Sequence, residues 1–158
     1  MKSLAMPHEY RHRLTVAFAD TDMAGIVHFS NFFKYMEETE HAFLRSLGIS
    51  VHTPTSEGLL SFPRVQAACQ FTKPLRFEDE VQVQLFVREK KNKSIAFDFA
   101  IHNLSADDPE PAAIGSLTVV CTLRSERDNR MRAVAIPPEM SSRIQEAPPE
   151  TLPHASDE

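Results

Sequence analysis

The strongest constraint on the fold is one helical segment that is followed by four segments of alternating apolar and polar residues. From about Ser30, the apolar residues fall on one wide stripe at helical spacing, which predicts a helix of about 18 residues that stops near Gly48. The alternating segments after it are RVQAACQFT, VQVQLFVRE, SIAFDFAIHN and SLTVVCTLR. A further one, RLTVAFAD, precedes the helix and is expected to end as a strand at Asp20. The simplest arrangement is one helix that covers the apolar face of one antiparallel sheet.

The connections between the alternating segments carry the Pro, Asn and Asp residues that are typical of turns. We therefore expect consecutive segments to be antiparallel neighbours. With 158 residues, 42% of them hydrophobic, the chain can form one domain with a substantial core. We expect this domain at 10–136, a short helix at 137–146 after a Pro-Pro pair, and a disordered, proline-rich tail at 147–158.

Charge, hydropathy and cysteine content exclude several classes of protein. A net charge of -5 argues against a nucleic-acid partner. No stretch has the apolar length of a signal peptide or a bilayer span, so we expect a cytoplasmic location and no membrane partner. Cys69 and Cys121 form no C-x-x-C pair, so neither a disulfide framework nor a zinc site is predicted.

The stretch FADTDMAGIVHFSNFFKYMEETE, residues 18–40, carries the most informative chemistry. Asp20 and Asp22 leave the predicted strand just before the predicted helix, where they could bind a cation, act as nucleophile or general base, or cap the turn and the helix. A hard cation would need several more oxygen ligands, so no metal site is predicted. Gly25 permits a tight turn, and the N–H groups of a helix start can stabilise a developing negative charge, so an acyl-transfer site stands beside the capping interpretation.

The same stretch resembles the hot-dog-fold acyl-CoA thioesterases, in particular the 4-hydroxybenzoyl-CoA thioesterase-like family. The resemblance covers about residues 10 to 135, and its most specific part is D-x-D-x-x-G-I-V with Asn31, Phe32 and Glu37 after it. It implies an α+β hot-dog fold in which a curled five-stranded antiparallel sheet wraps a long central helix. The implied activity is hydrolysis of an acyl-CoA thioester to a carboxylic acid and coenzyme A. Coenzyme A is then part of the substrate, and no separate cofactor is expected.

The resemblance also assigns roles to residues of the motif. It makes Asp22 the carboxylate that attacks the thioester or activates water, and Asp20 a supporting acid or a cap. It implies that a backbone N–H near Phe29, beside His28 and Gly25, polarises the thioester carbonyl. For the His28 side chain, a proton carrier and a packed, hydrogen-bonded ring are both open.

The acids and apolar residues of the predicted helix leave alternatives open. Glu37 stands where related thioesterases carry an acid, so the resemblance favours it as a third catalytic residue. Helical periodicity instead directs Glu40 inward and leaves Glu37 at the margin of the apolar stripe. Phe33 and Met36 are candidates for the acyl pocket, with the protein core as the alternative.

Basic residues near the mouth of the site are candidates for binding the phosphates of coenzyme A. The first candidates are Arg64, Lys90 and Lys91, and the others are Lys73, Arg76, Lys93 and Arg124.

Members of the family form homodimers with active sites between subunits, commonly paired into homotetramers, and we expect the same here. An exposed sheet edge, which is available for pairing, points the same way. The rival hypothesis is a non-catalytic module that binds acyl groups or acyl-CoA. Within the enzyme class, a thioester carried by an acyl carrier protein is a further alternative.

Overall fold

The computed structural model describes residues 6–154 and contains one long helix and two antiparallel sheets. The expectation of a hot-dog fold with a five-stranded sheet around a central helix is confirmed. In chain order the elements are β1 (Glu9–Thr15), η1 (Phe18–Asp20), α1 (Phe29–Ser46), β2 (His52–Thr55), β3 (Gly58–Ser61), β4 (Arg64–Phe71), β5 (Glu80–Lys90), β6 (Ser94–Asn103), β7 (Ala113–Val120), β8 (Thr122–Ser125), β9 (Met131–Ala133), α2 (Pro138–Ser141) and η2 (Pro149–Thr151).

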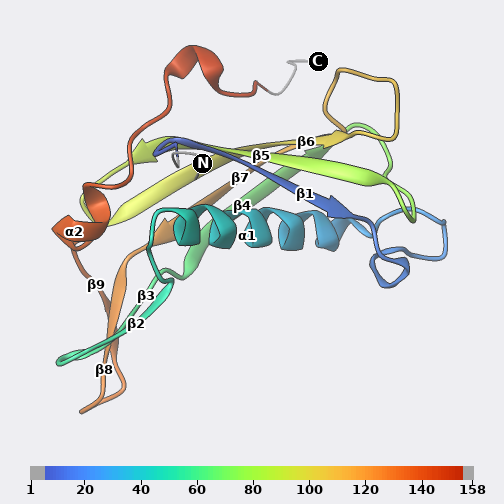
Figure 1. Cartoon of the computed structure of the whole chain (residues 1–158). Coiled ribbons are helices and arrows are strands. Elements are labelled where there is room, and N and C mark those ends of the chain that lie inside the picture. Colours follow the sequence, from blue (N-terminus) through green and yellow to red (C-terminus); the bar gives the residue numbers. More distant parts are fainter. Residues whose placement is uncertain (1–5, 155–158) are drawn as a thin grey trace.

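The large sheet curls over α1 and encloses the core between them (Figure 1). Its strand order is β1-β5-β6-β7-β4, with every neighbouring pair antiparallel. The helix faces this sheet with the predicted stripe, which includes the fully buried Met36 and Phe43. Gly115 in β7 lets the helix approach closely, because a Cβ atom at this position would collide with the Met36 sulfur. Gly48 ends the helix with a φ of +73°, as expected of a C-terminal glycine.

The prediction that the first strand ends at Asp20 is wrong. Strand β1 ends at Thr15, and the chain then turns through the 3-10 helix η1. Asp20 itself causes this turn, since its carboxylate accepts a hydrogen bond from the Ala17 N–H at 3.2 Å. Phe18, an apolar residue of the predicted strand RLTVAFAD, is 75% exposed.

The prediction that consecutive segments are neighbours holds for β5, β6 and β7 but is wrong for β4 and β5. These two strands lie apart in the sheet, because β4 pairs with β7 at one edge and β1 pairs with β5 at the other. Their connection passes beneath the loop before α1, where Leu75 is fully buried and its oxygen accepts the Val27 N–H at 2.8 Å. The connection thereby supports the start of α1.

A second sheet, with order β2-β3-β8-β9, projects from the end at which α1 finishes (Figure 1). It was not predicted, because its strands have only three or four residues and β2 contains Pro54. Gly58 is required there, since a Cβ atom would collide with the Arg124 backbone. The predicted segment 116–124 divides between β7 and β8 at Cys121.

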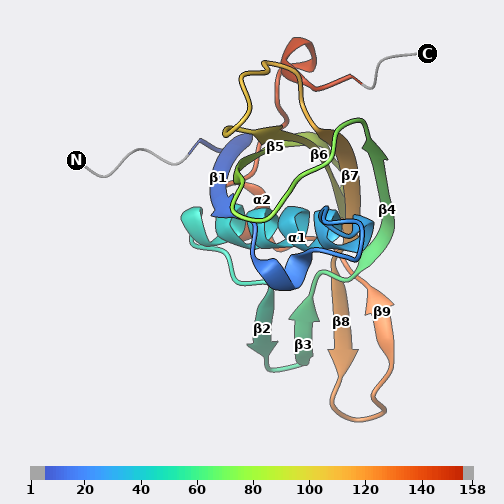
Figure 2. The ribbon, with the colours of Figure 1, turned by 90° about the vertical axis from the view of Figure 1, so that its right-hand side faces the viewer.

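The C-terminal part of the chain passes over the face of the large sheet opposite to α1 (Figure 2). Helix α2 lies within the predicted range 137–146 but has only four residues. The sequence predicted disorder for residues 147–154, whereas in the structure they pass over the large sheet. Ala147 is buried, its N–H donates to the Val87 oxygen at 2.8 Å, and η2 follows. The last part of that prediction, 155–158, lies outside the described residues. Among residues 6–154, no helix has the length and apolar content needed to cross a membrane.

Candidate functional site

A short loop brings Asp22 to the start of α1. Thr21 and Val27 form an antiparallel bridge at its base. Within it, the Asp22 N–H donates to the Ile26 oxygen at 2.9 Å, and Asp22 Oδ1 accepts the Ala24 N–H at 2.8 Å. Among the described residues, none donates a hydrogen bond to Oδ2. One carboxylate oxygen therefore fixes the side chain, and the other is available for a reaction.

Gly25 shapes this loop through its backbone conformation. Its φ is +78°, in the left-handed region that favours glycine. A Cβ atom here would meet nothing within 4 Å, so the space around Gly25 does not exclude a side chain. The Gly25 N–H donates to the Asp22 oxygen at 2.9 Å and is not free to bind a thioester oxygen.

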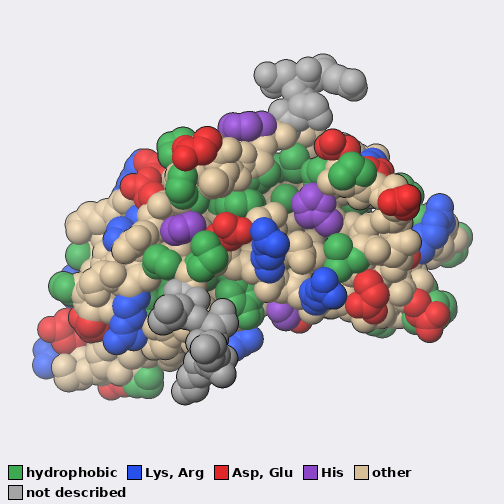
Figure 3. Space-filling model, turned by 45° about the horizontal axis from the view of Figure 1, so that its top comes forward, with side chains coloured by type: hydrophobic (Ala, Val, Ile, Leu, Met, Phe, Trp, Pro, Cys, Tyr) green, Lys and Arg blue, Asp and Glu red, His purple; other side chains and the backbone are tan. Residues whose placement is uncertain are grey.

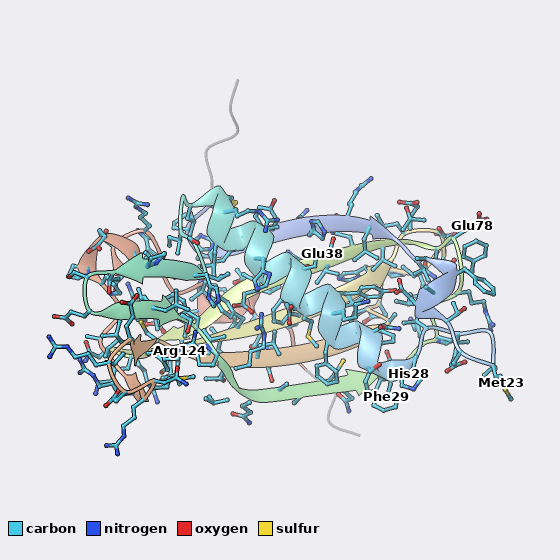
Figure 4. All side chains as sticks on the ribbon, turned by 90° about the horizontal axis from the view of Figure 1, so that it is seen from below. Met23, His28, Phe29, Glu38, Glu78 and Arg124 are labelled. Atoms are coloured by element: carbon cyan, nitrogen blue, oxygen red, sulfur yellow. The ribbon has the colours of Figure 1, made fainter. Side chains whose placement is uncertain are left out.

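His28 and Phe29 lie at the start of α1 (Figure 4), and among the described residues this first turn offers one free backbone donor. His28 is the N-cap, with Nδ1 accepting the Ser30 N–H at 3.3 Å, and its own N–H donates to the Asp20 oxygen at 2.9 Å. The His28 N–H is therefore already used, and the exposed His28 ring caps the helix through Nδ1, with its role in proton transfer still open. Within the described residues, the Phe29 N–H has no acceptor, as expected at a helix start. Of the three predicted backbone donors, Phe29 alone is available.

Asp20 holds the site together. Its Oδ2 accepts the Tyr35 hydroxyl at 2.9 Å as well as the Ala17 N–H, and its backbone oxygen accepts the Asn31 side-chain amide at 2.8 Å. Burial, and then the bond to Asp20, raise the pKa of the Tyr35 phenol, which stays protonated as a donor. These contacts tie η1 to the first two turns of α1 and favour a supporting role for Asp20. Within residues 6–154, no group of three or more His, Cys, Asp or Glu side chains is arranged to hold a metal ion.

A cavity of about 470 Å³ lies beside Asp22 and the start of α1, within the usual size range of small-molecule sites. One wall is aromatic. The Phe71 ring lies edge-on to those of Phe32 and Phe29, with centroids 5.0 and 6.5 Å away. Phe29 and Phe71 are 60% and 44% exposed, so a flat ligand can reach them. The remaining lining residues are Ile26, Val27, Thr72, Lys73 and Pro74.

The cavity uses different apolar residues from those expected. Met36 is fully buried against the sheet, and Phe33 packs against the core, so neither lines the cavity. Phe32 and Phe71 take their place. Both were visible as apolar residues of the predicted helix and strand, but only the position of β4 beside the start of α1 joins them.

A second group of charged residues lies further along α1. Glu40 is 1% exposed, and its Oε2 accepts from Arg64 Nη2 at 2.7 Å. Burial raises the pKa of the Glu40 carboxyl to about 7, although Arg64 acts against this shift. Glu37 is exposed, with an oxygen 3.6 Å from Arg64 Nη1. Periodicity therefore indicated correctly which acid is buried, while both acids and Arg64 lie outside the cavity lining.

The predicted phosphate-binding residues Lys90 and Lys91 lie at the far end of β5. Lys90 is committed to structure, since Nζ donates to the Ser141 and Ile144 oxygens at 2.8 Å each and closes the turn at α2. Lys91 is exposed, with Nζ 3.5 Å from a Glu89 oxygen. Strand β5 starts next to the end of β1, and its 11 residues separate both lysines from the Asp22 loop by about 30 Å.

Comparisons with known proteins agree with this architecture. A 1,4-dihydroxy-2-naphthoyl-CoA hydrolase from Picosynechococcus is 24% identical over 139 residues, which cover 88% of this chain and 94% of that protein. The crystal structure of a 1,4-dihydroxy-2-naphthoyl-CoA thioesterase from Synechocystis has a TM-score of 0.75 at 25% identity, covering 86% of this chain and 95% of that one. For a gentisyl-coenzyme A thioesterase, the TM-score is 0.70 at 31% identity, covering 86% and 100%.

The family model for the Thioesterase-like superfamily matches residues 16–144, which is most of the chain. The predicted class of enzyme, a thioester hydrolase, is thereby confirmed. The chain belongs to the Thioesterase-like superfamily.

Proposed function

We propose that this protein hydrolyses aromatic acyl-CoA thioesters at the cavity beside Asp22. One observation carries the proposal: an available carboxylate oxygen of Asp22 and the free N–H of Phe29 lie at the same cavity, which has an aromatic wall. A carboxylate and one aimed N–H donor are sufficient chemistry for a reactive thioester.

The Phe29 N–H would donate to the carbonyl oxygen of the thioester as negative charge develops on it. The exposed N–H groups and dipole of α1 add to this stabilisation. Asp22 then acts in one of two ways. As a nucleophile it forms an anhydride with the acyl group and releases the thiolate, and water cleaves the anhydride. As a general base it takes a proton from the attacking water. A single turnover in isotopically labelled water separates the two, because only the anhydride route can put label into the Asp22 carboxylate.

The aromatic wall supports an aryl acyl group as the substrate. A flat ring can stack on or pack edge-on against Phe29, Phe32 and Phe71. Such ring pairs contribute more binding free energy than the burial of the same apolar area alone. The two relatives from Picosynechococcus and Synechocystis and the gentisyl-coenzyme A thioesterase are all named for aromatic acyl-CoA substrates, which supports the same class.

A homodimer is part of the proposal. Strand β4 is an edge of the large sheet, pairs with β7 alone among the described strands, and is exposed along most of its length. A second copy could pair with this edge in the antiparallel direction. Such pairing places the Arg64 end of one β4 beside the Phe71 end of the other, which would return Arg64 to the neighbourhood of the substrate. A homotetramer stays a prediction.

A thiol-release assay with aromatic, short-chain and long-chain acyl-CoAs tests the proposal. We expect kcat/KM to be at least about tenfold higher for the aromatic substrates than for alkyl thioesters of similar size. Higher activity with alkyl chains would contradict the assignment of an aromatic pocket. Activity confined to carrier-protein thioesters would favour the carrier alternative. Binding without any turnover would contradict the enzymatic proposal.

A further inference from the structure

A second cavity, which no part of the proposed function has used, lies on the face of the large sheet opposite to α1. We call it the outer groove; its volume is about 460 Å³. Its floor comes from β5, β6 and β7, and two segments wall it: the β6–β7 loop with Glu110, and the C-terminal segment with Thr151 and His154 (Figure 2). Figure 3 shows that hydrophobic and histidine side chains gather on this face.

The C-terminal segment that forms one wall of the outer groove contacts the sheet at both of its ends. The Ala147 N–H bonds to β5, and Pro153 lies beside β4 and β7, where it lines both the outer groove and the neighbouring hollow at Cys69. Prolines 148 and 149 restrict the backbone between these points. The groove is therefore a built feature of the described fold.

The outer groove continues toward the Asp22 cavity. Thr72 and Lys73, just after the end of β4, line both cavities. Thr72 and Lys73 follow Phe71, the last residue of β4, so they lie past the stretch that would pair with a second copy, and a ligand can pass over this rim from one face of the sheet to the other. A substrate whose reacting carbon lies at Asp22 can thus extend over Thr72 into the outer groove.

The lining of the outer groove suits an uncharged amide chain. Its floor contains Phe86, Ala100 and Ile114, which offer apolar contact. Gln70 and His102 add neutral polar groups, and none of the hydrogen bonds between described residues uses either side chain. Burial lowers the pKa of the His102 imidazole, which keeps it neutral and able both to donate and to accept.

The charges of the outer groove do not suit a phosphate. Its one lysine, Lys73, is paired with Asp108, and Glu110 adds a further negative charge to the same wall. A diphosphate would meet no uncompensated cation among these lining residues, whereas an amide chain needs none.

We infer that the outer groove binds the pantetheine arm of the thioester substrate, with Gln70 and His102 hydrogen-bonded to its amide groups. The inference rests on the proposed function at Asp22, because the acyl group in that cavity fixes where the arm begins. The arm leaves the thioester, crosses the rim at Thr72 and Lys73, and lies on the floor of the groove. Its nucleotide end lies beyond the groove.

The test compares three thioesters of one acyl group, benzoyl: those of coenzyme A, of pantetheine and of N-acetylcysteamine, which keeps only the part of the arm next to the sulfur. The double substitution Gln70→Ala with His102→Ala removes the proposed amide contacts. We expect it to raise KM about tenfold for benzoyl-CoA and benzoyl-pantetheine alike, and by less for benzoyl-N-acetylcysteamine, which keeps only the first of the two amides. Thr118→Ala, on the same face of β7 but outside the groove, is the matched control and should change none of the three.

Four outcomes would overturn the inference. Equal changes for all three thioesters, or no change for any, would show that the arm does not bind there. A change for benzoyl-CoA alone would assign the groove to the nucleotide. A shift in the oligomeric state of the double variant, measured by light scattering, would identify the groove as a contact between copies of the chain.

A binding measurement separates this inference from the proposed function. The S-benzyl thioether of pantetheine cannot be hydrolysed, and its affinity can be measured by calorimetry. We expect the Gln70→Ala, His102→Ala protein to bind it about tenfold more weakly than the Thr118→Ala protein does. If the wild-type protein hydrolyses none of the three thioesters, the proposed function fails, and this titration still decides the inference: equal affinities would overturn it.

Discussion

Two acids, one in the loop before helix α1 and one within the helix, have surroundings that differ in almost every physical respect. At the start of α1, Asp22 stands in a loop beside a cavity, with a free helix N–H next to it and one oxygen unused. In the second half of the helix, about 16 Å further along the axis, Glu40 is buried under the sheet with Arg64 as its partner. The first acid can meet a substrate, whereas the second meets only the protein.

The comparison teaches that the surroundings of a carboxylate decide its role. Asp22 is held by one short loop bond and can change its interactions during a reaction. Glu40 is held by an arginine and by burial, and its Oε1 is buried without a hydrogen-bond partner among the described residues. The resemblance had favoured Glu37 as a catalytic acid, but it is exposed beside the same arginine. Substitutions at the two places should therefore affect different measurements.

Replacement of Asp22 should have the largest effect, and the effect should be on turnover. Asp22→Asn keeps the shape of the side chain and the bond from Ala24 but removes the nucleophile or base. We expect kcat to fall about 10²-fold to 10⁴-fold with an aromatic acyl-CoA, while the free energy of unfolding changes by less than about 0.5 kcal/mol. Thiol release and urea denaturation measure the two quantities.

Glu37→Gln is the matched control on the other side of the comparison. It removes a carboxylate from α1, the helix that also carries Glu40, at a position outside the cavity lining. We expect kcat to stay within about twofold of the wild-type value. A loss of turnover as large as that of Asp22→Asn would break the comparison, because it would mean that Glu37 reaches the substrate, for instance across a dimer contact.

Replacement of Glu40 should instead alter stability, in a way that depends on pH. Burial raises the pKa of its carboxyl from 4.5 to about 7, so the folded protein favours the protonated form. The contribution of the protonated Glu40 carboxyl to the free energy of unfolding is fully present below pH 4.5 and is lost as the pH rises to about 7. Glu40→Gln cannot ionise, so relative to this variant the wild-type protein should lose about 3 kcal/mol of unfolding free energy over that interval.

Urea denaturation of both proteins across that pH interval measures the difference. Glu37→Gln should lose slightly less unfolding free energy than the wild-type protein over this interval, because the Glu37 charge contributes to the raised pKa of Glu40. Parallel curves for wild type and Glu40→Gln would contradict a raised pKa and would show that Arg64 keeps Glu40 ionised. Turnover of Glu40→Gln near pH 7 should stay within about twofold of wild type.

Sequence patterns predicted the parts of the fold that depend on a long local repeat. The 18-residue helix α1 and the strands β5, β6 and β7 follow directly from hydrophobic periodicity, as does the burial of Glu40. The second sheet was missed, because its short strands are stabilised by pairing between segments that are far apart in sequence, such as Leu59 with Arg124. No local pattern reports such pairing.

The site divides in the same way. Asp22 and the donor near Phe29 lie in one continuous motif, so the sequence and the resemblance indicated both. Phe71 lies on β4, and only the tertiary fold brings it to Phe29. Lys90 appeared to be free for a phosphate, because nothing in the lysine-rich turn reveals that two backbone oxygens near α2 occupy its ammonium group.

Substitutions of Gly25 should have the smallest effect, and they concern the Asp22 side of the comparison. They test whether the Asp22 loop requires glycine for its backbone conformation or for the lack of a side chain. Gly25 has a φ of +78°, and a Cβ atom would meet nothing within 4 Å. Gly25→Ala should therefore cost about 1 kcal/mol of unfolding free energy through backbone strain alone. Gly25→Asn should cost less, although its side chain is larger, because asparagine adopts this conformation more readily. Urea denaturation ranks the two variants, and kcat should follow the same order, since the loop positions Asp22. If the asparagine variant were the less stable or the less active one, crowding at the loop or by the substrate would be the cause, and the backbone explanation of Gly25 would be wrong.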